Sequence, residues 1–223
     1  MLYTDTVIIL KCLHLVEKIK RKKTVDGFTK KVLLFAPQGF EDIEVAAFTD
    51  ILGWTRVLKE VKPVDVVITA FRKNICSKHG LTIKSHLLLN KINPDDYQAL
   101  IIPGGHNDSG YAEVYKKEVI NLIKKVYENG GVIATICVGA LPVARSGILE
   151  GKKATTYASS KRHDNLQVLR DCGAVPVDKR IVVTDRIITN RGPDTSVEVA
   201  FKLLEMLNGK EDMKKVRKAL MFN

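Results

Sequence analysis

The residue best placed for chemistry is Cys137, which follows the apolar run Val132 to Ile136. The β-branched residues of this run are typical of a buried parallel strand, and the residues after Cys137 are compatible with a helix. A cysteine at a sharp strand-to-helix turn has the geometry of a nucleophile elbow, with helix N–H groups pointing at the sulfur. Since these groups favour a thiolate, the pKa of the thiol is predicted to fall below its usual value. The alternative is a buried cysteine that only packs.

Three segments are expected to meet at this site because each of them follows a predicted parallel strand. The strands are predicted over residues 32–36, 99–102 and 132–136. The segments that follow them are Gly39-Phe-Glu41, Pro103-Gly-Gly105 and Cys137. Helices predicted over 41–52, 113–129 and 195–207 alternate with strands, which indicates a mostly parallel sheet with helices on both faces. In such sheets the functional site lies beyond the carboxyl ends of the strands.

Further elements complete the predicted α/β domain. A strand is predicted over 64–70, a hairpin within 71–89, and a strand pair over 181–184 and 187–189, with helices over 163–172 and 210–220. Thr195-Ser-Val-Glu198 has the spacing of a capping box for the helix over 195–207. Residues 1–30 are predicted to be a basic appendage outside the core fold, and residues 31–223 to form one domain. The appendage has its apolar run before its basic run, which is the reverse of a signal peptide.

Composition excludes several classes of protein. The chain has 36 basic and 25 acidic residues and a net charge of +11. This charge is scattered and no zinc-finger or RNA-binding signature occurs, so nucleic-acid binding is not expected. The four cysteines form no C-x-x-C pair, which argues against a zinc ribbon and fits a reducing cytoplasm. No apolar run approaches the ~20 residues that span a bilayer. We therefore expect no transmembrane segment, no metal and no cofactor.

Four motifs occur in an order that resembles the DJ-1/ThiJ/PfpI family, within the class I glutamine amidotransferase-like superfamily. They are Gly39-Phe-Glu-Asp-Ile-Glu44, Pro103-Gly-Gly105, Ala134-Thr-Ile-Cys-Val-Gly139 and Arg191-Gly-Pro-Asp-Thr-Ser196. The resemblance runs from about residue 31 to residue 209. It implies a flavodoxin-like three-layer sandwich, a homodimer and a reactive elbow cysteine.

The resemblance also implies roles for individual residues. Cys137 is the nucleophile, Glu41 is the carboxylate that touches it, and the backbone N–H groups of Gly105 and Val138 form an oxyanion pocket. A carboxylic acid in contact with the sulfur could donate a hydrogen bond to a thiolate or to a sulfinate. The other interpretation of Glu41 is an acidic residue that favours the helix dipole. Glu44 lies one turn later and is predicted to be solvated.

The chain lacks the histidine that would act as the general base in many relatives. Many relatives have a histidine after the strand that corresponds to residues 154–156, where this chain has Tyr157 and Ala158. Relatives of the protease type have a histidine directly after the cysteine, where this chain has Val138. His106 follows Gly105 and is the candidate substitute, although a loop histidine is often simply solvated.

Three functions follow from this constellation. In the first, Cys137 adds to reactive carbonyls, free or on modified proteins, in a glyoxalase- or deglycase-type reaction. In the second, the protein is a non-catalytic redox sensor or chaperone in the oxidative-stress response, and Cys137 is oxidised to a sulfinate. The third, peptide hydrolysis, is disfavoured by Val138.

Overall fold

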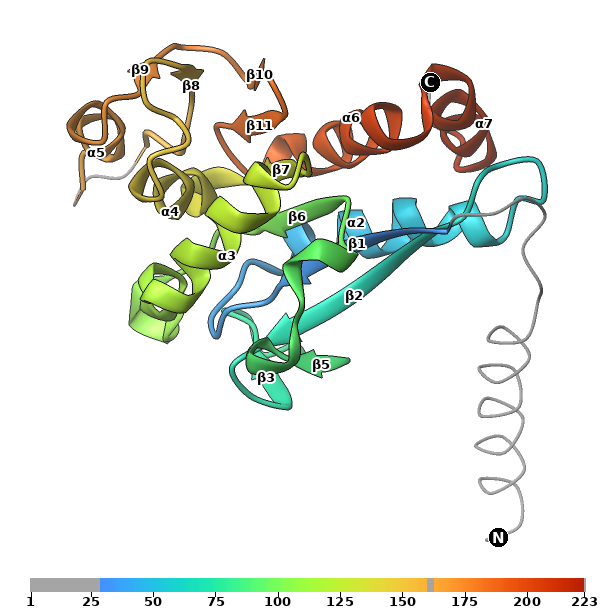
Figure 1. Cartoon of the computed structure of the whole chain (residues 1–223), viewed down its shortest axis with the longest axis horizontal. Coiled ribbons are helices and arrows are strands. Elements are labelled where there is room, and N and C mark those ends of the chain that lie inside the picture. The colour runs from blue at the N-terminus through green and yellow to red at the C-terminus, as the bar shows by residue number, and fades with distance from the viewer. Residues whose placement is uncertain (1–28, 160–162, 223) are drawn as a thin grey trace, which may run out of the picture.

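The computed structural model describes residues 29–159 and 163–222 and is built around one large sheet (Figure 1). The sheet has seven strands in the order β10-β11-β7-β6-β1-β2-β5. Their bounds are Ile181–Thr184 (β10), Ile187–Asn190 (β11), Val132–Thr135 (β7), Ala99–Ile102 (β6), Lys30–Phe35 (β1), Val64–Ala70 (β2) and Leu87–Leu88 (β5). Strand β10 pairs antiparallel with β11, and all the other pairs are parallel.

The strand order gives a flavodoxin-like fold, as predicted. The five central parallel strands lie side by side in the order β2, β1, β6, β7 and β11. If these five are numbered by their order along the chain, the spatial order is 2-1-3-4-5, which is the pattern of a doubly wound sheet. Strand order reverses between β1 and β6, so the loops after these two strands diverge to opposite faces. This is the switch point at which such sheets bind ligands, and the loop that contains Cys137 follows the adjacent strand β7.

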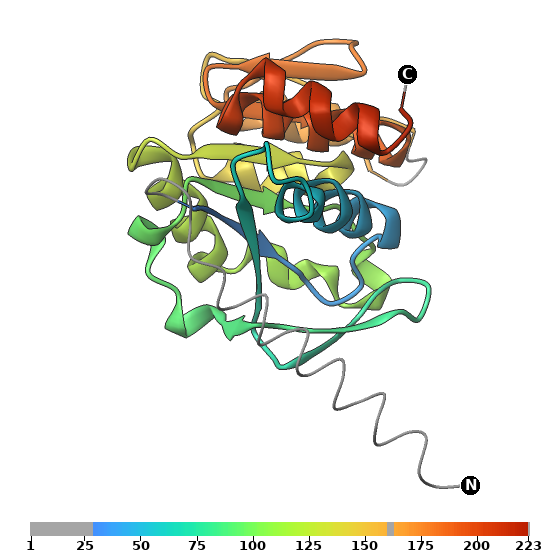
Figure 2. The same ribbon diagram turned by 90° about the vertical axis from the view of Figure 1, so that its right-hand side faces the viewer.

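Helices cover both faces of the sheet, as Figures 1 and 2 show. In β1, Val32 and Leu34 belong to the core beneath α2, α6 and α7, whereas Leu33 and Phe35 belong to the core beneath α3, α4 and α5. This alternation follows from the two-residue period of a strand. The helices are Asp42–Gly53 (α2), Lys117–Glu128 (α3), Ala140–Arg145 (α4), Asn165–Asp171 (α5), Ser196–Asn208 (α6) and Lys210–Ala219 (α7).

Two short two-stranded sheets lie outside the large one. The predicted hairpin around Gly80 is formed by β3 (Asn74–Cys76) and β4 (Thr82–Lys84), and β8 (Lys153–Ala154) pairs with β9 (Val175–Pro176). Two backbone hydrogen bonds join the β3–β4 hairpin to the loop after β1. Gly39 N–H donates to the Cys76 carbonyl at 2.8 Å, and Lys78 N–H donates to the Phe40 carbonyl at 2.8 Å. The β3–β4 turn therefore belongs to the switch-point edge.

Two local predictions are wrong. The helix predicted from residue 113 begins at Lys117, because Lys116 is extended and a 3-10 turn over Tyr111–Tyr115 is anchored by the Tyr111 hydroxyl on the Pro103 carbonyl. The capping box at Thr195 does not form. The Thr195 hydroxyl instead donates to the Gly192 carbonyl and accepts from Asn190, so it caps no helix N–H. The first signal was overridden by the contact of Tyr111 with the loop after β6, and the second by local hydrogen bonds of Thr195 to Gly192 and Asn190.

The predicted appendage falls almost entirely outside the described residues, and Lys30 already belongs to β1. Within the described ranges, no helix is long and apolar enough to cross a membrane. Three cysteines lie in these ranges, Cys76, Cys137 and Cys172, and none of them forms a disulfide there.

Candidate active site

Cys137 occupies a nucleophile elbow. Its φ is 55°, in the left-handed region that non-glycine residues rarely adopt. It follows β7 and opens a 3-10 turn, Cys137–Gly139, that leads into α4. Gly139 permits the sharp turn, since a Cβ at this position would lie 2.3 Å from the Ile102 carbonyl oxygen. A strained residue at a strand-to-helix turn has the backbone geometry of a nucleophile elbow.

Two long-range hydrogen bonds hold this strained residue. Cys137 N–H donates to Asn190 Oδ1 at 2.7 Å, and the Thr156 hydroxyl donates to the Cys137 carbonyl at 2.9 Å. Asn190 is fully buried, and its amide also donates to the Gly192 carbonyl and the Thr195 hydroxyl. Sequence reasoning missed Asn190. The available signal was a polar residue directly after the strand predicted over 187–189.

Asn190→Ala is expected to lower the free energy of unfolding by about 1–3 kcal/mol, because the Cys137 N–H loses its acceptor inside the protein. Urea denaturation measures this loss. Asn107→Ala is the control, because Asn107 is exposed and surface substitutions usually stay within about 0.5 kcal/mol. Equal stability of Asn190→Ala and the parent protein would contradict the anchoring role.

The carboxyl group beside Cys137 belongs to Glu44. Glu44 has no exposed surface, and its Oε2 accepts the Gly104 N–H at 2.5 Å. The carboxyl also interacts with the Cys137 thiol, and Oε1 meets no further donor among the described residues. A Cβ on Gly104 would lie 2.9 Å from both the Glu44 carboxyl and the Cys137 Cβ. Because Gly104 has no side chain, the Glu44 carboxyl, the Gly104 N–H and Cys137 can lie close together.

The predicted contact between Glu41 and the cysteine is therefore wrong, and so is the prediction that Glu44 is solvated. The reason is where the helix starts. Glu41 is the N-cap of α2, and its side chain caps no N–H but turns away from the helix. Glu44 lies within the first turn, where side chains tilt back toward the helix N-terminus. This direction carries the Glu44 carboxyl under the loop after β6.

Burial controls the ionisation of the pair. It raises the pKa of Glu44 to about 8, against the opposing Gly104 hydrogen bond and with a smaller contribution from the charge of Glu41. Burial also raises the pKa of the Cys137 thiol, and repulsion by ionised Glu44 adds to this effect. The predicted lowering of the thiol pKa is wrong. The elbow helix α4 is only one and a half turns long, and Val138 N–H is the donor that acts on the sulfur.

The other proposed oxyanion donor is Gly105, which forms an isolated antiparallel bridge with Phe40. Through this bridge, Glu41 N–H donates to the Gly104 carbonyl and His106 N–H donates to the Gly39 carbonyl. The loops after β1 and β6 are thereby joined above the switch point. The roles of Gly105 and Val138 in binding an oxyanion remain predictions.

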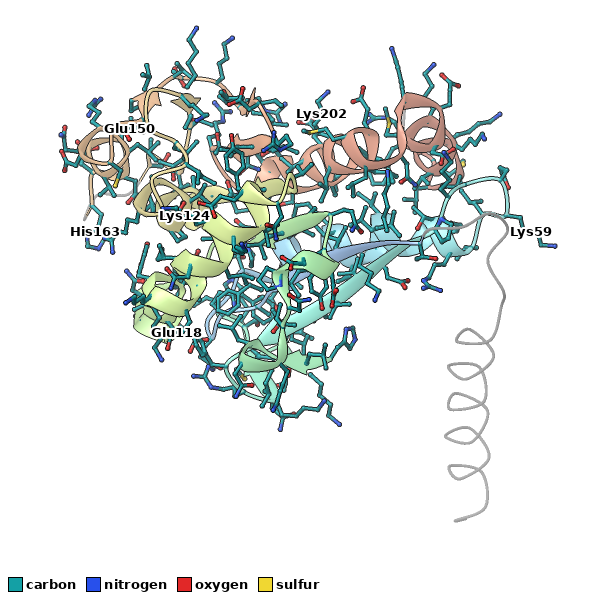
Figure 3. The ribbon with its side chains drawn as sticks, viewed as in Figure 1. Lys59, Glu118, Lys124, Glu150, His163 and Lys202 are labelled. Atoms are coloured by element: carbon teal, nitrogen blue, oxygen red, sulfur yellow. The ribbon has the colours of Figure 1, made fainter. Side chains whose placement is uncertain are left out.

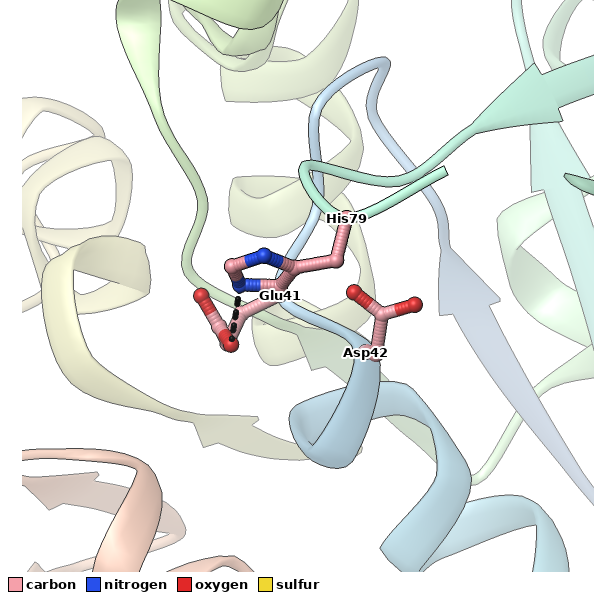
Figure 4. A group of neighbouring side chains, drawn as sticks. All are labelled: Glu41, Asp42 and His79. Carbon is pink, nitrogen blue, oxygen red and sulfur yellow. Dashed lines mark hydrogen bonds and ion pairs between the residues drawn. The ribbon is translucent and has the colours of Figure 1, made fainter. Parts of the chain in front are cut away.

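Glu41 joins two imidazole rings, those of His79 and His106. His79 Nε2 lies 3.2 Å from Glu41 Oε1, and His106 Nε2 lies 3.2 Å from Glu41 Oε2. The side chain of Glu41 is 20% exposed, whereas those of His79 and His106 are 62% and 49% exposed. Figure 4 shows the His79 ring turned onto Glu41, with Asp42 on its other side. Sequence reasoning missed His79, because it is 38 residues from Glu41.

The segment that replaces the family histidine does run beside the elbow. Thr156 contacts the Cys137 carbonyl, and the next residue is Tyr157. The Tyr157 ring lies near Gly192, and its carbonyl accepts the Asn165 amide. Within the described part of the chain, the groups that shift the pKa of the Cys137 thiol are Glu44, Val138 N–H and Glu41, with no imidazole among them.

The comparison with known families agrees with this geometry. The sequence model of the DJ-1/PfpI family matches residues 30–206, which is most of the chain. The chain belongs to the DJ-1/PfpI family. The match begins at β1 and ends within α6, so this DJ-1/PfpI domain includes the loops that carry Glu44, Gly104 and Cys137.

Individual relatives carry the names DJ-1 and PfpI. The chain is 31% identical to Protein DJ-1 homolog A of Arabidopsis thaliana over 87% of its length, but it spans only 47% of that relative. It is 29% identical to Deglycase PfpI of Pyrococcus furiosus, over 73% of this chain and 90% of the relative. The solved structure of Drosophila melanogaster DJ-1beta matches with a TM-score of 0.75 and 27% identity, over 88% of this chain and all of that one.

Proposed function

We propose that Cys137 and Glu44 act together on small reactive carbonyls, either free or attached to modified proteins, in a glyoxalase- or deglycase-type reaction. The observation that carries this proposal is the contact between a buried carboxyl and an elbow thiol. A relative named a deglycase supports the substrate class. A carboxyl with a pKa of about 8 can both take and give a proton near neutral pH.

The proposed reaction needs no oxidant and no cofactor. Glu44 takes the thiol proton as the sulfur attacks the aldehyde carbon, and then gives it to the carbonyl oxygen, so that a hemithioacetal forms. With a dicarbonyl such as methylglyoxal, Glu44 next moves the proton of the C–S carbon to the neighbouring carbonyl carbon, while the hydroxyl proton of the hemithioacetal passes to the oxygen of that carbonyl. The product is a thioester. Water then cleaves the C–S bond, which releases a hydroxy acid and restores the thiol.

The neighbouring groups have supporting roles in this proposal. Val138 N–H already points at the sulfur, and Gly105 N–H is the second candidate donor to the developing oxyanion. Glu41 acts on Cys137 through its charge rather than by contact. It also holds His106 at the mouth of the site, where the imidazole could bind the polar end of a substrate.

The decisive experiment measures glyoxalase and deglycase rates of the parent protein and of Cys137→Ala. We expect activity in the parent and loss of it in the variant. Cys172→Ala serves as a control, because it removes a thiol that lies at the end of α5 rather than at the elbow. Equal rates for the parent and Cys137→Ala would eliminate the carbonyl proposal.

A second candidate function is redox sensing through sulfinate formation at Cys137. The observation that favours it is the set of partners around the sulfur, an acid and an N–H but no imidazole among the described residues. Two equivalents of peroxide would convert the thiol to sulfenate and then sulfinate, with one water released in each step. Intact-mass measurement after mild peroxide tests this function, and absence of oxygen addition at Cys137 would remove it.

Other expectations from the sequence stay predictions. They are a homodimer, a cytoplasmic location, a role in stress response and an N-terminal appendage over residues 1–30. Peptidase activity remains the least supported function, because Val138 stands directly after Cys137 and no imidazole within the described ranges contacts the sulfur.

A further inference from the structure

We propose that Glu41, Asp42 and His79 bind one divalent transition-metal ion of the zinc class beside the cysteine site. One ligand atom of each residue lies within 4.8 Å of the others. Imidazole and carboxylate donors together suit zinc and its first-row neighbours better than Mg²⁺ or Ca²⁺. Cys137 is not a ligand in this proposal, so it can be tested separately from the proposed function.

The spacing of the donor atoms fits such an ion. Zinc bonds to nitrogen and oxygen are about 2.0–2.2 Å long, which places the donors of a tetrahedral site about 3.4 Å apart. His79 Nε2 and Glu41 Oε1 are already 3.2 Å apart. The His79 side chain is 62% exposed, so its ring has room to rotate toward Asp42 and leaves a face open for water ligands. Figure 4 shows the three side chains converging from two segments of the chain.

The two carboxylates are held by neighbouring side chains, Asp42 by Ser77 and Glu41 by His106 and His79. Asp42 Oδ1 accepts the Ser77 hydroxyl at 2.8 Å, while Asp42 Oδ2 is shielded from solvent and has no hydrogen-bond donor among the described residues. Glu41 Oε2 is held by His106 Nε2. Metal-binding carboxylates are oriented in this way by outer hydrogen bonds to the oxygen that does not bind the metal. An ion on Asp42 Oδ2 would also remove the cost of an unpaired buried oxygen.

The helix dipole favours Asp42, which lies in the first turn of α2, but it does not explain the contacts of Glu41. Glu41 is the N-cap of α2, but its carboxylate makes no capping hydrogen bond. Lys78, which directly precedes His79, forms an ion pair with Asp108 at 3.0 Å. The two acids of the proposed site therefore gather around an exposed imidazole, in a chain whose net charge is +11.

The two segments that supply the ligands are held together by hydrogen bonds. Lys78 N–H donates to the Phe40 carbonyl at 2.8 Å, and His79 N–H donates to the Ser77 hydroxyl at 3.2 Å. The β3–β4 turn is thus fixed against the start of α2 without any metal. A site that exists before the ion arrives binds without first having to order its ligands.

Calorimetric titration of Zn²⁺ into the full-length, metal-stripped Cys137→Ser protein tests this proposal, because that background removes the reactive thiol. We expect one site, with affinity reduced at least about 10-fold in His79→Ala and in Asp42→Asn, since loss of an outer-shell partner alone costs about 10–100-fold. Ser77→Ala should give an intermediate loss. Mg²⁺ should not compete.

His163→Ala is the control for non-specific imidazole binding, because His163 lies just before α5 (Figure 3) and is not a member of the group Glu41, Asp42 and His79. Thermal melts verify that each variant is folded, and the exposed His79 ring can be removed without opening the core. Co²⁺ substitution gives a second readout. We expect visible d–d bands without a sulfur-to-metal charge-transfer band.

Three results would overturn the metal site. They are absence of Zn²⁺ binding, equal affinity in the parent and His79→Ala, and a charge-transfer band that reports thiolate ligation. The last would place the ion on another cysteine, such as Cys76 in the same hairpin. None of these results would alter the test of Cys137 on carbonyls.

Discussion

Glu44→Gln is expected to lower carbonyl turnover by about 10²–10⁴-fold, the usual contribution of a proton-transferring side chain. Glutamine has the size of glutamate and can still accept the Gly104 N–H, but it cannot carry a proton between the thiol and the substrate. The fold should be retained, because Gly104 keeps its hydrogen-bond partner. Steady-state kinetics with methylglyoxal measure the loss.

The same variant separates the two candidate functions. Ionised Glu44 raises the pKa of Cys137 by repulsion, so its neutral replacement favours the thiolate. We therefore expect alkylation and peroxide oxidation of Cys137 to stay equal or become faster in Glu44→Gln, while turnover collapses. Retained turnover would show that Glu44 carries no proton, and a parallel loss of oxidation would show that it acts only by positioning.

Glu41→Gln is the matched control for this experiment. It is also an acid-to-amide change at the start of α2, but Glu41 contacts imidazoles rather than the sulfur. Its charge reaches Cys137 only as a secondary influence. We expect less than about a 10-fold change in turnover, since no proton-transferring group is removed. A larger loss in Glu41→Gln than in Glu44→Gln would reverse the assignment of the two acids.

Gly139→Ala is expected to lower the free energy of unfolding by about 3 kcal/mol, at the upper end of the range for overpacking. The added Cβ would lie 2.3 Å from the Ile102 carbonyl oxygen and 3.0 Å from that of Pro103. Both contacts are with backbone, which cannot rotate away. The elbow must therefore move relative to the end of β6, where Glu44 is anchored through Gly104. Denaturant unfolding measures the stability loss.

Activity should fall together with stability in this variant. A displacement of about 1 Å between reacting groups can cost about 100-fold in rate. Gly53→Ala is the control, because its φ is −59° and nothing lies within 4 Å of the added Cβ. That change should raise stability by about 0.4–1 kcal/mol. If Gly139→Ala were as stable and as active as Gly53→Ala, the close approach of the elbow to β6 would have no functional importance.

Several features of this protein could be predicted from local sequence because local chemistry determines them. The β-branched run before Cys137 predicted β7, and the alternation of apolar strands with amphipathic helices predicted the parallel sheet. The position of Cys137 at the end of that run predicted the elbow, which its φ of 55° confirms. These features depend on residue type and on spacing within about ten residues.

The choice between Glu41 and Glu44 was beyond the sequence. Both are acids in the same segment, but Glu41 falls at the extended N-cap of α2 whereas Glu44 falls in its first helical turn. Only the packed structure shows that Glu44 is buried against Gly104 while Glu41 faces His79 and His106. The thiol pKa was mispredicted for the same reason, because burial and the neighbouring charge outweigh the short helix.

By itself, the sequence determined the sheet, the elbow cysteine and the edge at which the site lies, because periodicity and turn residues act along the chain. Tertiary structure alone decided the partners of that cysteine. Asn190 reaches Cys137 across 53 residues, and Glu44 reaches Gly104 across 60. Contacts between residues so far apart depend on how strands and helices pack, and that packing sets which side chains lose water and which remain exposed.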